Sequence, residues 1–201
     1  MTKRLSIQDL AIGQLTGVTL RIDPGEIVCL SGVSGSGKSR LLRAIADLDS
    51  HEGEVRLNDT PASAMPADQW RRAVMLVPAE SRWWDESVRA HCGEESPADL
   101  EALGLEPSVL DWPVSRLSSG EKQRLALYRA LSFQPRALLL DEPTANLDET
   151  SKHRVEQWLC ERIRRDQLPT LWVAHDPEQI RRVASAHYMI KGERVEVQSW
   201  N

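Results

Sequence analysis

An eight-residue stretch, GVSGSGKS, constrains this chain more than any other feature. It occupies residues 32–39 and contains three glycines, three serines and one lysine. The apolar run EIVCLS precedes it and is typical of a buried strand, and the run RLLRAIADL after it has apolar residues at helical spacing. The stretch is therefore predicted to turn the chain from a strand into a helix.

The spacing within this stretch matches the phosphate-binding pattern G-x-x-x-x-G-K-[S/T]. In such a loop, successive backbone amides point at an anion, and the following helix adds the positive end of its dipole. Lys38 is expected to reach the outer phosphates, and Ser39 to place its hydroxyl on a magnesium ion. A flexible Gly/Ser turn is the alternative, but the position between strand and helix favours a nucleoside triphosphate. The residues expected to contact the nucleotide here are Gly32, Val33, Ser34, Gly35, Ser36, Gly37, Lys38, Ser39 and Arg40.

A second motif, ALLLDEP, reads as a buried strand that ends in two carboxylates. Asp141 is expected to hold the magnesium ion, and Glu142 to act as general base on the attacking water. Pro143 cannot continue a central strand, so the strand should end where the carboxylates emerge. A solvated acidic turn is the alternative, but it is a weak one beside a phosphate loop.

The segment LSSGEKQRLALYRAL predicts a helix that begins with a capping box between Ser118 and Glu121. Ser118, Ser119 and Gly120 at the start of this helix would form a second anion site. One nucleotide does not need two such sites. Two copies of the chain, facing each other head to tail, would use both.

Length and pattern predict one α/β domain over residues 1–201, because strands alternate with helices along most of the chain. This alternation predicts a mainly parallel sheet that is covered on both faces. "RRAVMLVP" is expected to be a strand, and "HYMIKGERVEVQ" a hairpin around Gly192. Residues 81–116 read as short helices and loops, and a helical subdomain is expected over about residues 81–130.

Charge and composition narrow the function classes. The net charge of −5 argues against nucleic acid as a partner. No apolar run reaches the roughly 18 residues of a membrane span, and the N-terminus lacks the apolar core of a secretory signal. The three cysteines, Cys29, Cys92 and Cys160, are widely spaced and show no zinc pattern, which favours a reducing, cytoplasmic setting.

Five motifs, in this order, make the chain resemble the nucleotide-binding ATPase subunit of an ATP-binding-cassette (ABC) transporter. GVSGSGKS resembles the Walker A loop, LSSGE the family signature LSGGQ, and ALLLDEP the Walker B strand. ANLD resembles the D-loop, with Asp148 in its aspartate position, and WVAHD carries His175 in the switch-histidine position. The resemblance covers nearly the whole chain.

The resemblance implies a P-loop NTPase fold with an N-terminal antiparallel β region and a short helical subdomain. It implies ATP and Mg²⁺ as cofactors, and Lys38, Glu142 and His175 as catalytic residues. His175 would touch the γ-phosphate, and Asp148 would contact the phosphate loop of the opposite subunit. It further implies a membrane permease as partner, a homodimer across two ATP sites, and a cytoplasmic protein peripheral on the inner face of the inner or plasma membrane.

The chain departs from the family pattern in three places. Ala79, followed by Glu80, stands where the family has a glutamine that helps to coordinate magnesium; Glu80 could replace it with a shift of one residue. The segment LAIGQLTGVTL has no aromatic residue to stack on adenine, so the base is expected on an aliphatic side chain such as Ile12 or Leu15. The insert between Ala79 and Leu117 is also short for the family.

Two adjacent tryptophans, Trp83 and Trp84, follow the position of the missing glutamine. Neighbouring residues cannot easily both face a core, so one is expected to be exposed and to contact a permease. The alternative is that both are core residues. For the whole chain, the alternatives to a transporter ATPase are a soluble ABC-type ATPase without a membrane partner and a cassette that hydrolyses ATP weakly.

Overall fold

The computed structural model describes residues 3–94 and 96–199, and its strands form two sheets. The first has the order β2-β1-β4-β5, and the second has the order β10-β9-β3-β8-β7-β6. The strands are β1 (Leu5–Ile12), β2 (Leu15–Ile22), β3 (Ile27–Gly32), β4 (Glu52–Leu57), β5 (Thr60–Pro61), β6 (Val74–Val77), β7 (Ala137–Asp141), β8 (Thr170–Val173), β9 (Ala186–Lys191) and β10 (Arg194–Gln198).

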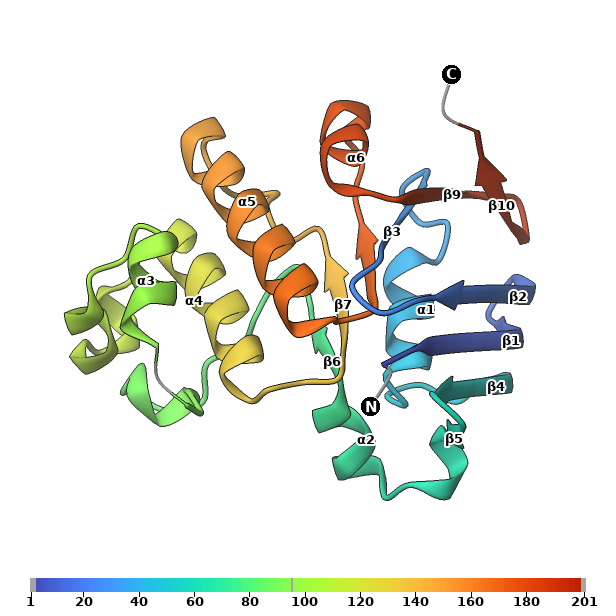
Figure 1. Cartoon of the computed structure of the whole chain (residues 1–201), viewed down its shortest axis with the longest axis horizontal. Coiled ribbons are helices and arrows are strands. Elements are labelled where there is room, and N and C mark those ends of the chain that lie inside the picture. The colour runs from blue at the N-terminus through green and yellow to red at the C-terminus, as the bar shows by residue number, and fades with distance from the viewer. Residues whose placement is uncertain (1–2, 95, 200–201) are drawn as a thin grey trace.

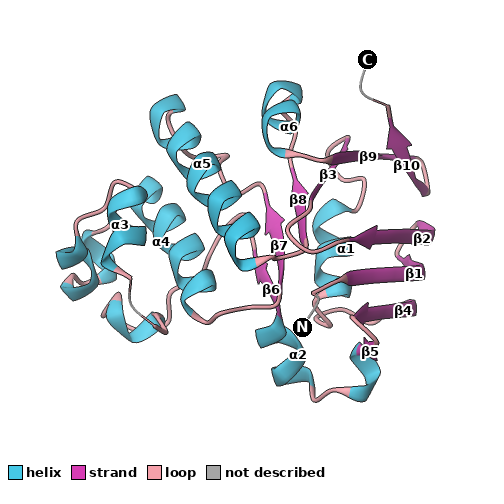
Figure 2. Cartoon of the chain, viewed as in Figure 1, coloured by secondary structure: helices cyan, strands magenta, loops and turns pink. Residues whose placement is uncertain are grey.

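Helices cover the second sheet on both faces, as Figures 1 and 2 show. The α-helices are α1 (Lys38–Ile45), α2 (Ala67–Ala73), α3 (Pro97–Ala102), α4 (Ser119–Ser132), α5 (Glu149–Asp166) and α6 (Pro177–Val183). Short 3₁₀ turns are η1 (Ala62–Ala64), η2 (Arg89–His91), η3 (Pro107–Asp111) and η4 (Val114–Arg116).

The first sheet is antiparallel, and the second is parallel except at its β9–β10 edge. Every residue of β7 and β8 is buried, as expected of parallel strands with both faces covered. Helix α1 fills the space between the two sheets, where Leu41, Leu42 and Ile45 are fully buried. Helices α4 and α5 cover the opposite face of the second sheet. The structure therefore has the α/β architecture that the sequence predicts.

The described residues between β6 and β7 form the helices α3 and α4, the 3₁₀ turns η2, η3 and η4, and the loops that join them; this helical segment lies beside α5 at one end of the molecule (Figure 1). The hairpin around Gly192 is confirmed, with φ of 59° at the glycine. The predicted strand from Arg71 is wrong in its first three residues, because helix α2 continues to Ala73. Trp70 anchors this helix, since its buried indole donates a 3.0 Å hydrogen bond to the carbonyl oxygen of Ile45.

The three cysteines are free thiols. Cys29 and Cys160 are buried in the core, as expected of small apolar side chains, and Cys92 is half-buried.

Candidate functional site

The glycine-rich stretch forms a loop between β3 and α1, as the sequence predicts. Gly35 and Gly37 have φ of 78° and 98°, in the left-handed region that favours glycine. Gly37 is the N-cap of α1, so the backbone curls just before the positive end of the helix dipole. The Ser36 hydroxyl is buried and has no hydrogen-bond partner among the described residues, which fits a loop built to meet a polar ligand.

Lys38 is buried at the base of this loop. Its ammonium group donates to the carbonyl oxygens of Gly32 at 2.9 Å and Val33 at 3.0 Å. Burial lowers the pKa of Lys38 below its usual value, while the charges of Glu142 and Asp141 oppose that shift. One cation is thus fixed inside the loop and faces two carboxylates across the strand ends.

Ser39 and Asp141 come together beside Lys38. Burial raises the pKa of the Asp141 carboxyl, and a hydrogen bond with the Ser39 side chain partly offsets that rise. A hydroxyl beside a carboxylate fits Mg²⁺, which takes only one or two protein oxygens and completes its shell with water and phosphate. Among the residues that the structure describes, no cluster of three or more His, Cys, Asp or Glu could hold a metal by itself.

Glu142 and His175 form a close pair at the same edge of the sheet. Asp141 is in register with Val173, so the chain segments after both residues leave the sheet side by side. The Nε2 atom of His175 lies 2.7 Å from Oε1 of Glu142. Glu142 has φ of 48°, a strained conformation for a residue with a side chain, and its amide donates to the Val173 carbonyl at 3.2 Å. Strain of this kind at a strand end is common at functional sites.

Two hydrogen bonds that the sequence did not predict hold the segments that follow β7 and β8 in place. Lys152 Nζ donates to Asp176 Oδ2 at 2.8 Å, next to His175. Asp176 also caps α6, whose first residue is Pro177. The cap had a readable signal, because Asp before Pro is a typical helix start. Gln123 of α4 donates to the Pro143 carbonyl at 3.1 Å, so α4 is bonded to the segment that follows Asp141 and Glu142.

A buried polar network lies behind the pair. Gln179 donates to the hydroxyl of Thr144 at 2.7 Å and to Glu156 at 2.8 Å, and Arg182 makes two hydrogen bonds to the same Glu156 carboxylate. The network joins α5, α6 and the turn after β7. It therefore fixes the backbone from which Glu142 and His175 project.

The expected capping box at the start of α4 is confirmed. The Ser118 hydroxyl accepts from the Glu121 amide at 3.3 Å, and the Glu121 carboxylate accepts from the Ser118 amide at 2.9 Å. Hydrogen bonds from Ser118 lower the pKa of the Glu121 carboxyl. Ser118 and Ser119 are exposed and Gly120 is half-buried.

The helix start at Ser118 and the phosphate loop lie in different parts of the molecule. Figure 1 shows α4 on one side of β7 and α1 on the other, and no hydrogen bond or ion pair between described residues joins Ser118, Ser119 or Gly120 to residues 32–40. Asp148 caps α5 through a 3.0 Å hydrogen bond from the Ser151 amide, and its carboxylate is exposed.

The residues at which the chain departs from the family pattern lie in two parts of the structure. Val77, the last residue of β6, is in register with Leu140, so Ala79 follows at the same sheet edge as Asp141. Ala79 is half-buried, and the Glu80 side chain is exposed. Ile12 and Leu15 are both buried, so they offer little surface for a base to rest on. Leu15 instead supports the phosphate loop, since a Cβ added at Gly37 would lie 3.3 Å from its Cδ1.

The two tryptophans have different environments, as expected. Trp84 is 73% exposed, whereas Trp83 packs against the core. His91 makes edge contacts with both rings, and the Arg129 guanidinium lies over both, 4.7 and 5.2 Å from their centroids. The insert therefore folds back over Arg129 of α4.

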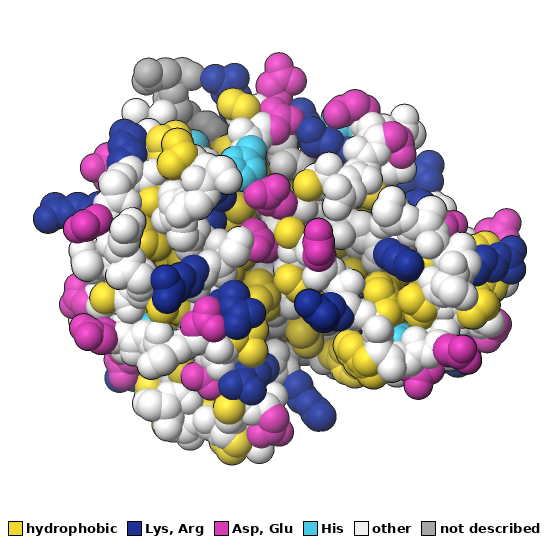
Figure 3. Space-filling view, turned by 180° about the vertical axis from the view of Figure 1, so that it is seen from behind, with side chains coloured by type: hydrophobic (Ala, Val, Ile, Leu, Met, Phe, Trp, Pro, Cys, Tyr) yellow, Lys and Arg dark blue, Asp and Glu magenta, His cyan; other side chains and the backbone are white. Residues whose placement is uncertain are grey.

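Trp84 lines an apolar groove of about 400 Å³ between β6 and α4. Figure 3 shows the back of the molecule, where hydrophobic side chains gather in a hollow between the sheet and the helical segment. The apolar residues of this groove include Met75, Leu76, Pro78, Trp84, Ala126 and Phe133. Arg71, Arg72 and Arg129 also line it and make it basic.

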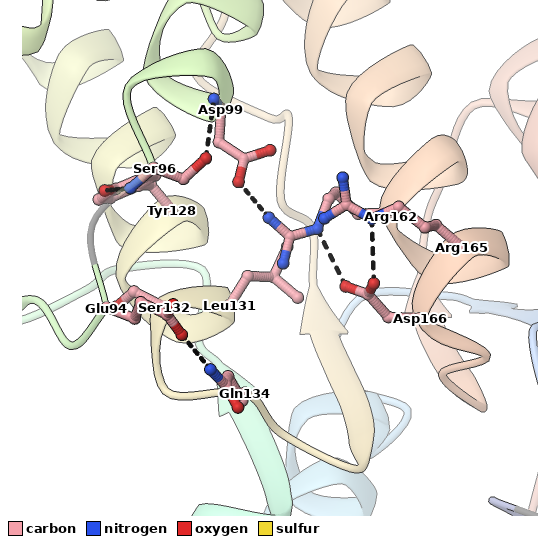
Figure 4. A pocket seen from close by; sticks show the side chains of 10 residues that line it. All are labelled: Glu94, Ser96, Asp99, Tyr128, Leu131, Ser132, Gln134, Arg162, Arg165 and Asp166. Atoms are coloured by element: carbon pink, nitrogen blue, oxygen red, sulfur yellow. Dashed lines mark hydrogen bonds and ion pairs between the residues drawn. The ribbon is translucent and has the colours of Figure 1, made fainter.

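A second cavity, of about 410 Å³, lies between the helical segment and α5 (Figure 4). Arg162 crosses it and bonds to Asp99 of α3 and, at 3.0 Å, to Asp166. The indole of Trp158 donates to the other oxygen of Asp99 at 2.9 Å. These bonds attach the helical segment to α5. The polar residues that line the cavity therefore have a structural role, which is to join these two parts of the molecule.

A family model described as "ABC transporter" matches residues 15–145. The chain is 32% identical to the probable iron export ATP-binding protein FetA of Escherichia coli, over 83% of this chain and 80% of that protein. It is 38% identical to the aliphatic sulfonates import ATP-binding protein SsuB of Pseudomonas putida, over 90% of this chain and 68% of that protein.

Longer proteins also match. The sulfate/thiosulfate import ATP-binding protein CysA of Bradyrhizobium diazoefficiens is 34% identical over 90% of this chain, which spans 58% of that protein. A bacterial Atm1-family ABC exporter solved with ATP bound shares the fold with a TM-score of 0.85 at 22% identity. The match covers 98% of this chain and 39% of that one. No helix among the described residues is long and apolar enough to span a membrane.

Proposed function

The chain belongs to the ABC transporter family, and we propose that it binds Mg²⁺ and ATP, hydrolyses the ATP, and drives a membrane transporter as a dimer. The observation that carries this proposal is the convergence at one sheet edge of Lys38, the Ser39–Asp141 contact and the Glu142–His175 pair. These groups supply a cation that binds the phosphates, a metal site, and a general base with the residue that orients it.

Each group has a separate task. Lys38 neutralises the outer phosphates, and the loop amides with the α1 dipole hold the inner ones. Ser39 and Asp141 would hold Mg²⁺, which when bound neutralises charge on the β- and γ-phosphates. Glu142 takes a proton from the attacking water. His175 holds the Glu142 carboxylate in position and faces the γ-phosphate.

A second copy completes each site. The exposed start of α4 offers amides and hydroxyls to an anion, but it is remote from the phosphate loop of its own chain. Two chains facing head to tail would bring Ser118, Ser119 and Gly120 of each onto the nucleotide of the other. Asp148 would meet the opposite phosphate loop. ATP then joins the two copies, and hydrolysis releases them.

The groove between β6 and α4 is the proposed site for the membrane partner. It is apolar along its floor and carries Arg71, Arg72 and Arg129. This chemistry suits an amphipathic cytoplasmic helix of a permease that has acidic side chains beside its apolar face. Exposed Trp84 would be the anchor. The chain would then lie on the cytoplasmic face of the inner or plasma membrane.

Hydrolysis of ATP by the purified chain tests the enzymatic part of the proposal. Hydrolysis should require Mg²⁺ and should be abolished by Lys38→Ala, whereas Lys191→Ala, at an exposed lysine that ends β9, should leave it unchanged. A pull-down from membranes with the tagged chain tests the partner, and it should retain a polytopic membrane protein. Hydrolysis that persists in Lys38→Ala would contradict the proposed site.

A further inference from the structure

A hollow of about 480 Å³ lies between the β1–β2 hairpin and the start of α1. Figure 1 shows this hairpin on the other side of α1 from β7, the strand that ends just before Glu142. It is formed by the tight turn between β1 and β2, by the first turn of α1, and by the residues that lead into β4. Gly13, Thr16, Arg40, Ser50 and His51 are among its lining residues. A cavity of this size is within the range that binds small ligands.

Arg40 packs directly on the hairpin turn. A Cβ added at Gly13 would lie 2.7 Å from Arg40 Nη1 and 3.3 Å from Cζ, so the guanidinium occupies the space that a side chain would need. Gly13 has φ of 63°, in the left-handed region that favours glycine, and the missing side chain leaves room for the guanidinium. Within residues 3–94 and 96–199, the Arg40 side chain makes no hydrogen bond or ion pair. The nearby carboxylate of Asp49 is instead bound twice by Arg43, at 2.9 and 2.7 Å.

The direction of a bound nucleotide points to this hollow. The outer phosphate must face Glu142 and His175, so the inner phosphate and the sugar must leave the loop at its other end. Arg40 directly follows Ser39, and its guanidinium extends to Gly13 in the β1–β2 turn, while Leu15 of the same hairpin lies next to Gly37. The hollow is therefore the cavity that the base would reach, and the β1–β2 turn offers no aromatic ring to meet it.

We propose that this hollow is the base subsite and that Arg40 stacks its guanidinium plane on the nucleobase in place of an aromatic ring. The imidazole of His51 forms the rim, held by a 3.2 Å contact between Nδ1 and the Asp49 carbonyl. Stacking on a planar cation recognises the face of a base and not its edge, so the site accepts ATP and GTP with similar affinity. This inference rests on the proposed binding of a nucleoside triphosphate.

Calorimetric titration with three probes tests it: Mg²⁺–ATP, Mg²⁺–GTP and Mg²⁺–tripolyphosphate, which has no base. The Arg40→Lys variant keeps the positive charge but loses the planar guanidinium group. It should bind ATP and GTP about tenfold more weakly, and tripolyphosphate within about twofold of the wild type. The matched control is Arg43→Lys, one turn further along α1, which should bind all three probes as the wild type does.

Each other outcome contradicts a definite part of this account. An equal loss of affinity for ATP and tripolyphosphate in Arg40→Lys would mean that Arg40 contacts the phosphates. An unchanged affinity for ATP would mean that Arg40 contacts neither the base nor the phosphates. Both outcomes would overturn the base subsite and leave the proposed function intact. A wild-type preference for ATP over GTP of about 100-fold would overturn face-only recognition. Failure of the wild type to bind either ATP or tripolyphosphate would overturn the proposed function together with the subsite.

Discussion

The Nε2 atom of His175 lies 2.7 Å from Oε1 of Glu142, across two neighbouring parallel strands. The two residues are 33 positions apart in the chain, and the register of β7 with β8 brings them together. Glu142 has φ of 48°, so the turn after β7 holds the carboxylate under strain while the imidazole fixes its direction. The geometry predicts that catalysis depends on both residues.

Replacing His175 with alanine should slow hydrolysis by about 100-fold, because the carboxylate loses the group that orients it. His175 acts through Glu142, so the KM for ATP should stay within about twofold of the wild type while kcat falls. Steady-state kinetics measure both quantities. His153→Ala, at an exposed histidine on α5, is the control and should change neither. A rise in KM without a fall in kcat would show that His175 only binds substrate.

Adding ATP to the Glu142→Gln variant should convert monomers to dimers, because stalled nucleotide bridges two copies. Ser118→Arg in that variant should keep the chain monomeric, since a bulky cation at the start of α4 blocks the approach of the partner's nucleotide. Light scattering at saturating ATP measures the molar mass of the particles and so distinguishes monomers from dimers. Ser115→Arg, an exposed serine three residues earlier, should still dimerise. Dimers that persist with Ser118→Arg would exclude this helix start from the interface.

The two tryptophans should behave differently when changed to alanine. Trp84 is 73% exposed, so Trp84→Ala should change the free energy of unfolding by no more than about 0.5 kcal/mol and should weaken membrane association. Trp83 packs on the core, and Trp83→Ala should cost a large part of the about 3–5 kcal/mol typical of buried tryptophan. Urea unfolding and membrane co-sedimentation measure the two effects. Normal membrane association of Trp84→Ala would remove Trp84 as an anchor.

Arg162→Met should destabilise the protein by about 2–4 kcal/mol, because it leaves the Asp99 carboxylate, 11% exposed, without its cation. Arg165→Met on the same helix should cost less than about 1 kcal/mol, since Arg165 is 64% exposed. Urea unfolding of both variants measures the difference. Equal stability of the two variants would contradict the role given to Arg162 in joining the helical segment to the core.

The same junction predicts a pH dependence. Although burial raises it, hydrogen bonds from Arg165 and Arg162 lower the pKa of the Asp166 carboxyl overall. A lowered carboxyl pKa stabilises the fold above the ordinary value of about 3.9, and this stability is lost as the pH falls through the folded-state pKa. The gap in unfolding free energy between wild type and Arg162→Met should therefore shrink below about pH 4. A gap that stays constant down to pH 2 would contradict the charge argument.

Local signals in the sequence predicted much of this molecule. The glycine-rich loop around Gly35 and the capping box at Ser118 each depend on neighbours within a few residues, so their patterns can be recognised in the sequence. The end of α2 was misplaced because Trp70, which holds that helix, bonds to the distant Ile45.

Contacts between distant residues left no such signal. Arg162 and Asp99 are 63 positions apart, and Gln123 reaches Pro143 across 20. Nothing in the composition of either segment identifies its partner, since many arginines, glutamines and carboxylates are available. The close approach of Arg40 to Gly13 is of the same kind. These pairings depend on how the sheet order places its helices, which only the structure gives.

Single-turnover hydrolysis of ATP by the wild type and by Glu142→Gln tests the central claim most directly. The substitution keeps the shape of the side chain but removes the base, so the account predicts unchanged ATP affinity and a rate lower by about 10²–10⁴-fold. Hydrolysis by Glu142→Gln at the wild-type rate, with Mg²⁺ and saturating ATP, would contradict it.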